Sequence, residues 1–429
     1  MKQDARKLPL LEAEGREGQS KRTVNVGEVM LSVAADFREM MVRGGSAIAA
    51  ALFEDEIEKL CGPKFARGEG LASRWGKQPG EAVLGGRKVK LMHPRVRRKG
   101  REVSLESYRQ IQEEDPLSER ALEQMLIGVS TRRYARSLEP IPTELEERGT
   151  SKSSVSRHFV ARTEAQLEAE LCKPLGDRNW AAAMMDGIQF HEHVILIALG
   201  IDETGKKHLL GFREGTTENA TVCRELLADL IARGVAPDRS LLFVIDGGKG
   251  LRKAINDTFG RYGVVQRCQV HKKRNVREHL PEASRTRIGS VMSQAYSTSD
   301  YAKALQQLKN LATSIEKECP SAASSLREGI EETLTLKKLG VTGSLAKTLE
   351  STNTIENLNG GIRRVSGRVK RCRHGSMARR WVVTAAIEAS RGFRRLRGYK
   401  QMPVLMTALR ARDTQAETNK TNDNVRQVA

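Results

Sequence analysis

Residues 181–190 read AAAMMDGIQF, residues 193–202 read HVILIALGID, and residues 241–246 read LLFVID. These short apolar runs lack the 3.6-residue spacing of an amphipathic helix, which predicts buried β-strands. Residues 207–212 and 264–271, the latter reading VVQRCQVH, are similar. Two helical patterns, over 219–233 and 250–259, separate the later strands. The predicted order is therefore β-β-β-α-β-α-β, with the first three strands forming an antiparallel meander.

The sequence changes character after this order. Residues 272–350 are rich in Lys, Glu, Leu and Ala and predict an inserted helical block, after which 351–387 is mostly helix. This is the layout of an α/β, RNase H-like mixed-sheet catalytic domain with an all-helical insertion. We expect a mainly helical DNA-binding region before it. The expected segments are a flexible start (1–25), a helical and basic region with a glycine-rich loop at 68–86 (26–115), a helix-turn-helix-like region (116–175), the first part of the core (176–271), the insertion (272–350), the last part of the core (351–411) and a flexible tail (412–429).

Composition limits the class of protein. The 429 residues include 73 Lys and Arg against 53 Asp and Glu, a net charge of +20, which favours a polyanionic partner. The longest apolar run, residues 47–53, is too short to span a membrane, and the N-terminus has no apolar signal core. We expect a cytoplasmic, nucleoid-associated protein. The six cysteines form no close pair, which argues against a zinc finger or a disulfide framework.

Basic residues gather in two stretches. Residues 87–101 hold eight cations and no acid, which indicates either a phosphate-contacting segment or a solvated loop or edge strand. Residues 360–400 hold thirteen cations and one acid, which suits a DNA backbone. A helix capped by Thr150 or Ser151 resembles a recognition helix, with a plain helical hairpin as the alternative; we expect its partner helix to start at Ser130 or Thr131. The expected DNA-binding residues are Lys152, Ser153, Ser156, Arg157, Arg364, Arg368, Lys370, Arg371, Arg379 and Arg380.

Three acids are placed where this strand order can bring them together. Asp186 lies in the first strand, Asp246 ends the fourth, and Glu356 follows the insertion. Each acid also has an ordinary explanation: a turn at Asp186, a strand-ending turn at Asp246, and a capping box in which Glu356 reaches back to Asn353. Their conjunction favours a catalytic cluster. Three converging carboxylates suit two Mg²⁺ ions, with Mn²⁺ as an alternative, which are the ions that phosphodiester hydrolysis needs.

Two further features accompany the acids. Cys268 and His271 form a C-x-x-H pair, which is too small for a structural zinc site and indicates either a core cysteine with a strand-end histidine or a pair that orients the active site. Arg363 lies two helical turns beyond Glu356 and shares its face. The adjacent Gly360 and Gly361 favour either close approach to DNA or a helix break.

Four motifs in this order resemble those of the mutator-type insertion-sequence transposases. They are Asp186-Gly-Ile, residues 244–251 (VIDGGKGL), residues 266–275 (QRCQVHKKRN) and residues 351–359 (STNTIENLN), with Arg363 following. The resemblance covers about residues 117–401 and implies a DDE triad of Asp186, Asp246 and Glu356 that binds the metals. It assigns Cys268 and His271 to the motif after the second acid and Arg363 to the basic residue after the glutamate, so that all three belong to the catalytic site. Gly360 and Gly361 depart from the family pattern, and residues 1–80 match nothing in it.

The resemblance also implies the partners. They are double-stranded DNA, both terminal inverted repeats and target, bound by a homodimer or a higher oligomer. We expect metal-dependent strand cleavage and strand transfer. The alternatives are a structure-selective nuclease with the same fold and a sequence-specific DNA-binding regulator without catalysis.

Overall fold

The computed structural model describes residues 26–64, 72–84, 86–113, 116–138, 147–215 and 219–428. The chain folds as two compact units. Residues 1–117 and 132–152 belong to the first unit, and residues 118–131 and 153–429 belong to the second. The predicted start at 1–25 lies outside the described residues. Within them, no helix is long and apolar enough to cross a membrane.

The first unit combines one long helix with a small antiparallel sheet. Its elements are α1 (Val26–Cys61), β1 (Ser73–Leu84), β2 (Arg87–Arg98), β3 (Arg101–Val103), α2 (Glu106–Glu113) and β4 (Glu147–Arg148). Ile57 and Cys61 of α1 pack with Val96 and Leu105 in its core. The predicted helix at 26–60 is confirmed. The glycine-rich loop predicted at 68–86 is wrong from residue 73 onward, because β1 pairs with β2 around a bulge between Arg74 and Lys77.

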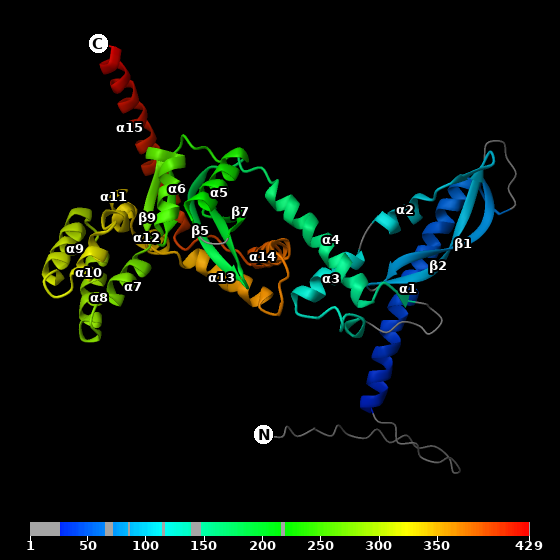
Figure 1. The fold of residues 1–429 in the computed structure, drawn as a ribbon. Helices are drawn as coiled ribbons and strands as arrows, with labels where there is room; N and C mark the ends of the chain where they lie inside the picture. The colour runs from blue at the N-terminus through cyan, green and yellow to red at the C-terminus, as the bar shows by residue number, and fades with distance from the viewer. Residues whose placement is uncertain are drawn as a thin grey trace, which may run out of the picture. The chain divides into compact units, whose positions relative to one another are not determined.

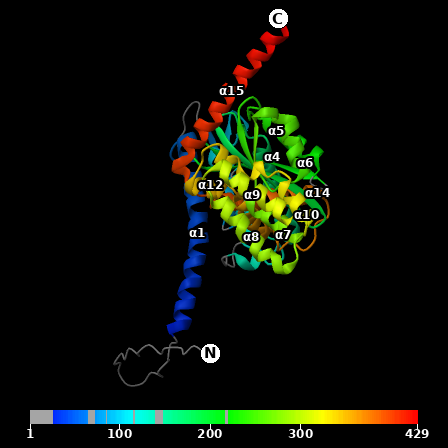
Figure 2. The same ribbon diagram turned by 90° about the vertical axis from the view of Figure 1, so that its left-hand side faces the viewer.

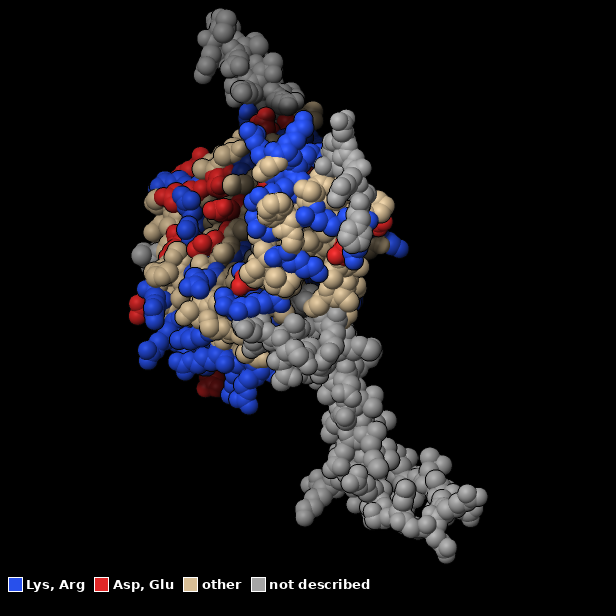
Figure 3. All heavy atoms as spheres, turned by 90° about the vertical axis from the view of Figure 1, so that its right-hand side faces the viewer, with Lys and Arg blue, Asp and Glu red and all other residues tan. Residues whose placement is uncertain are grey.

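Most of the basic segment 87–101 forms β2, which pairs with β1 on one side and, near its two ends, with β4 and β3 on the other. The edge-strand alternative is therefore wrong for β2, whereas Arg101 begins the short strand β3. Pairing also supplies acids that the segment lacks: Arg95 makes a bidentate ion pair with Glu102 (2.8 and 2.7 Å), and Lys88 lies 3.7 Å from Glu81. Strand pairing thus neutralises part of a charge run that seems uncompensated in the sequence. Lys and Arg side chains are nevertheless widespread on the face shown in Figure 3.

The second unit contains a mixed five-stranded sheet (Figure 1). Its strands are β5 (Trp180–Phe190), β6 (His193–Asp202), β7 (Lys207–Gly215), β8 (Leu241–Ile245) and β9 (Gly263–Arg267). Their spatial order is β7-β6-β5-β8-β9, antiparallel from β7 to β5 and parallel from β5 to β9. The predicted meander and strand order are confirmed. The exception is the end of the last strand: Gln269, Val270 and His271 are helical.

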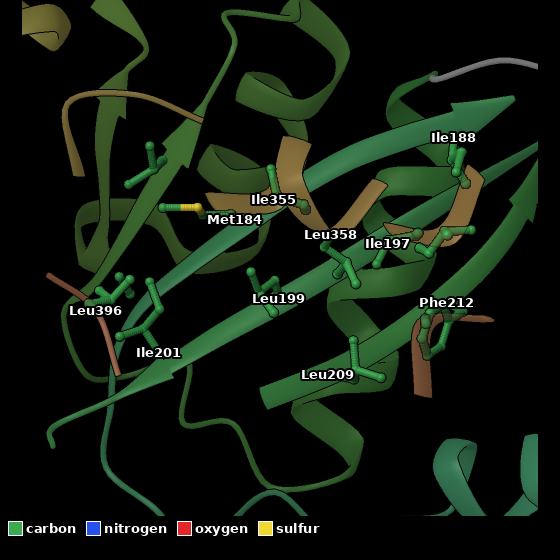
Figure 4. Packing of buried hydrophobic residues seen from close by; sticks show 14 of the residues in the cluster. Met184, Ile188, Ile197, Leu199, Ile201, Leu209, Phe212, Ile355, Leu358 and Leu396 are labelled. Atoms are coloured by element: carbon green, nitrogen blue, oxygen red, sulfur yellow. The ribbon is translucent and has the colours of Figure 1, made fainter. Parts of the chain in front are cut away.

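Alternation along the strands divides the core into two layers. Met184 and Val244 face one layer, in which Ile355 and Leu358 also lie (Figure 4). The residues next to them in the chain, Met185 and Phe243, face the other layer. The first layer is covered by α4 (Lys152–Leu171), α12 (Gly343–Leu349), α13 (Asn353–Ser366), α14 (Gly375–Ser390) and α15 (Met402–Val428), and the second by α5 (Ala220–Ala232) and α6 (Lys249–Phe259).

The predicted insertion is helical and has a core of its own. Its helices are α7 (Gln269–Glu278), α8 (Glu282–Ser297), α9 (Tyr301–Ile315), α10 (Pro320–Arg327) and α11 (Thr335–Lys338). Helices α7 to α10 form a group (Figures 1 and 2), and α11 contacts β9. Buried Lys272 anchors α7 to this group, because its Nζ donates to the carbonyls of Ser325 and Glu328.

Three local predictions are wrong. After α3 (Pro116–Leu126), the partner helix expected from Ser130 or Thr131 is reduced to a single 3₁₀ turn, Ala135–Ser137, so the described residues do not form a standard helix-turn-helix. The sequence also predicts a separate acidic helix at 163–171, but these residues continue the recognition-like helix as a single helix, α4. The tail expected to be flexible from 412 continues α15 as far as Val428.

Candidate active site

Strand register brings the first two acids together. Met184 pairs with Val244 across the parallel strands β5 and β8. Two residues further along each strand, Asp186 and Asp246 follow with the same side-chain direction. They therefore face the layer that α13 covers, and α13 carries Glu356 in its first turn. Asp186 lies inside β5 opposite Ile197, so the alternative of a simple turn at this position is wrong.

The charges of the three acids interact. Burial, the charge of Asp246 and, less strongly, that of Glu356 raise the pKa of Asp186 to about 6. Asp186 Oδ2 accepts a 2.7 Å hydrogen bond from Asn359 Nδ2, and Asn359 lies one turn after Glu356 on the same helix. Asp186 is therefore half-buried among like charges, an arrangement that a cation would relieve.

The turn after β8 holds Asp246 in place. Its Oδ1 accepts a 2.9 Å hydrogen bond from the Gly248 amide, so the strand-ending turn predicted as an alternative also exists. Gly247 has φ +110°, and a Cβ there would lie 2.2 Å from Arg267 Nε. Glycine is required at this position both for the backbone conformation and for the buried arginine.

Glu356 is oriented by Thr352 rather than by a capping box. The buried Thr352 hydroxyl donates to Glu356 Oε1 at 2.6 Å. His271 Nδ1 lies 3.2 Å from the same hydroxyl oxygen and 3.9 Å from Glu356 Oε1. Because a hydroxyl has one proton, donation to the carboxylate leaves the Thr352 oxygen free to accept from a protonated His271 Nδ1. The sequence prediction of an Asn353–Glu356 capping box is therefore wrong.

The Cys268–His271 pair belongs to the same network. Cys268 is the buried N-cap of α7, and its Sγ accepts from the backbone amides of His271 (3.5 Å) and Thr352 (3.4 Å). Burial alone would raise the pKa of the Cys268 thiol, but hydrogen bonds with His271 and Thr352 outweigh burial and lower that pKa to about 7. The cysteine raises the pKa of His271, as do the charges of Glu356 and Asp246. The pair therefore connects the start of α7 to the acid cluster, and the strand-end histidine expected from the sequence is a helical one.

The predicted DNA-binding residues have different surroundings. Most are exposed: Lys152, Ser153, Ser156, Arg157, Arg364, Arg368, Lys370 and Arg371. Arg363, which the resemblance assigns to the catalytic site, is also exposed. Arg368 donates to the carbonyl of Ile127. Arg379 is half-buried near Glu214 (3.8 Å). Arg380 is only 8% exposed and lies 3.7 Å from Glu164, so its guanidinium is not available at the surface and we correct that prediction.

The adjacent glycines of α13 are explained by helix packing. The helix continues unbroken through both. A Cβ on Gly361 would lie 3.0 Å from the Ala389 Cβ, whereas one on Gly360 would meet nothing within 4 Å. Gly361 thus permits close approach of α14, and neither DNA nor a helix break is needed to account for it.

Sequence reasoning did not single out Thr352 and Asn359. Both lie within the motif at 351–359, and their spacing provides a signal: Thr352 is four residues before Glu356 and Asn359 is three residues after it. Residues at these separations share a helix face with the acid.

Most of the sequence matches a known family. The family described as "Transposase, Mutator family" matches residues 21–394. The match begins well before residue 117, so the expectation that residues 1–80 match nothing in the family is wrong for residues 21–80. The chain belongs to the Mutator family of transposases. It is 27% identical over 351 residues to the transposase of insertion sequence element ISRM5 of Rhizobium meliloti, covering 79% of this chain and 84% of the relative. The transposase of IS256 in Tn4001 from Staphylococcus aureus is 27% identical over 57% of this chain and 62% of its own length. The IS406 transposase of Burkholderia multivorans is 29% identical over 57% and 63%, respectively.

Proposed function

We propose that this transposase cleaves and joins DNA strands with a DDE triad of Asp186, Asp246 and Glu356 on an RNase H-like domain. The observation that carries the proposal is the convergence of three carboxylates: parallel pairing of β5 with β8 puts Asp186 beside Asp246, and α13, which carries Glu356, contacts Asp186 through Asn359. The order β7-β6-β5-β8-β9 supports the RNase H-like assignment. Membership of a transposase family supports DNA as the substrate.

The donor chemistry fits Mg²⁺. The three acids offer hard oxygen ligands, and buried Asn359 holds an Oδ1 that has no hydrogen-bond partner among the described residues. In the described part of the chain, no three His, Cys, Asp or Glu side chains form a ready-made metal-binding group. Asp186, Asp246 and Glu356 are the residues that would hold the ions. When bound, Mg²⁺ activates water and stabilises the leaving oxygen of a phosphodiester.

The chain's own residues have distinct parts in this proposal. Asn359 orients Asp186, the amide of Gly248 orients Asp246, and Thr352 orients Glu356. Hydrolysis of a phosphodiester at the end of the element would release a 3′-hydroxyl. In-line attack of that hydroxyl on a second phosphodiester would form the new P–O bond, break the old one and release the 3′-hydroxyl of the attacked strand. We further propose that the enzyme acts as a dimer or higher oligomer on the terminal inverted repeats.

Cleavage of a duplex that carries one end of the element tests the proposal. We expect Asp246→Asn to abolish Mg²⁺-dependent cleavage while leaving DNA affinity intact. Asp238→Asn is the matched control, because Asp238 is an exposed acid before the opposite end of β8. Equal cleavage by the wild type and Asp246→Asn would refute the triad.

Either of two further results would favour an alternative function. Cleavage by the wild type without joining of precleaved ends would indicate a structure-selective nuclease. Tight, sequence-specific binding by the wild type that leaves DNA intact in Mg²⁺ would indicate a regulator.

A further inference from the structure

A groove of about 830 Å³ lies between α7 and α8 of the inserted helical block. The two helices lie side by side in Figures 1 and 2. Four cations line it, Lys273, Arg274, Arg277 and Arg285, against one acid, Glu278. The groove is therefore a concave, strongly positive surface that the triad does not explain.

These cations have no acidic partners in the described part of the chain. Lys273 Nζ contacts Ser293 Oγ at 3.2 Å, and Arg285 Nε donates to the carbonyl of Leu280 at 3.0 Å, so uncharged groups orient both. Arg274 and Arg277 are exposed. Like charges three and four residues apart on one helix destabilise it, so this arrangement suits an external anion.

Helix α7, which lines one side of the groove, begins beside the acid cluster. Arg274 lies three residues after His271 on α7, and His271 lies 3.9 Å from the Glu356 carboxylate. Residues three apart on a helix are neighbours. From His271 to Arg277 the helix rises about 9 Å, the length of roughly two to three phosphates along one DNA strand. A strand leaving the acids along α7 would meet these cations in turn.

Gly289 of α8 also lines the groove. A Cβ at Gly289 would lie 3.5 Å from Arg277 Cδ, an ordinary contact. Alanine would therefore fit sterically and would favour the helix. Glycine leaves room for a ligand where helix propensity alone favours a side chain.

We infer that this groove binds the sugar-phosphate backbone of the DNA strand that runs from the acid cluster, an inference that rests on the proposed function. Guanidinium groups and hydroxyls bind phosphate oxygens without reading bases, so binding here is independent of sequence. The groove therefore fixes the path of the DNA strand across the insertion and does not select its base sequence.

Salt-dependent DNA binding without divalent metal tests this inference. We expect Arg274→Gln/Arg277→Gln to weaken binding of a mixed-sequence duplex at least about tenfold, and to reduce the slope of log K against log salt by about two. The matched control is Lys303→Gln/Lys309→Gln, which removes two exposed charges from α9, outside the groove. Thermal unfolding confirms that both variants are folded.

The outcomes separate this inference from the proposed chemistry. An unchanged slope for the Arg274/Arg277 variant, or an equal loss in the α9 control, would overturn the groove assignment. Displacement of the duplex by polyglutamate as effectively as by single-stranded DNA would assign the groove to acidic peptides instead. Because no metal is present and no cleavage is measured, failure of the triad leaves this result unaffected.

Discussion

Replacement of Thr352 by valine isolates the hydroxyl that orients Glu356. Valine preserves the branched shape of a side chain that is only 2% exposed, but it removes the 2.6 Å bond to Glu356 Oε1 and the 3.2 Å contact with His271 Nδ1. A hydrogen bond to a charged group contributes about 1.5–3 kcal/mol. If that energy holds the carboxylate in its reactive position, cleavage slows by roughly 10- to 100-fold.

Single-turnover cleavage of an end-containing duplex in Mg²⁺ measures this effect. Thr352→Ser is the control, because serine keeps the hydroxyl and should retain most of the rate. DNA affinity of both variants should equal that of the wild type, since Thr352 is buried. Equal rates for Thr352→Val and the wild type would refute the role of this hydroxyl in positioning Glu356.

Three other changes test separate parts of the structure. Asp246→Asn removes a like charge and should lower the pKa of Asp186 from about 6. A ¹³C carboxyl titration of the metal-free protein measures this pKa, and an unchanged value would contradict the proximity of Asp186 and Asp246. Gly361→Leu should lower the free energy of unfolding in urea by about 1–3 kcal/mol, because the leucine forces α13 away from α14. Gly360→Ala should be neutral or stabilising. Equal effects of the two substitutions would contradict the packing of Gly361 against α14. Burial lowers the pKa of Lys272 from 10.5 to about 8. Between these pH values the folded protein loses this proton before the unfolded chain does, so the free energy of unfolding should rise with pH. The rise should reach about 3 kcal/mol relative to Lys272→Met. Parallel stability curves for the two proteins would show that the lysine is not buried.

The sequence was informative where local pattern and topology agree. Continuous apolar runs identified the strands of the main sheet, and the position of Asp246 at a strand end placed it beside Asp186 once the strands were parallel. The break of pattern at residue 272 marked the helical insertion. These features depend on alternation and chain order, which a single sequence contains.

The wrong predictions concern segments whose structure depends on contacts with residues far away in the sequence. Strand β1 contains Gly76 at φ +79° and Pro79, and only its pairing with β2 makes it a strand. The end of β9 continues the apolar pattern, but the Cys268 cap starts a helix there. Arg380 belongs to a basic stretch in sequence, yet folding buries it near Glu164. Charge and apolar patterns do not contain these tertiary contacts.

The most direct test of the central claim is the location of metal in a crystal of the protein bound to an end-containing duplex and soaked in Mn²⁺. We predict anomalous scattering peaks in contact with the carboxylates of Asp186, Asp246 and Glu356, beside a phosphodiester of the DNA. Peaks at another site, with these three side chains free of metal, would contradict the account.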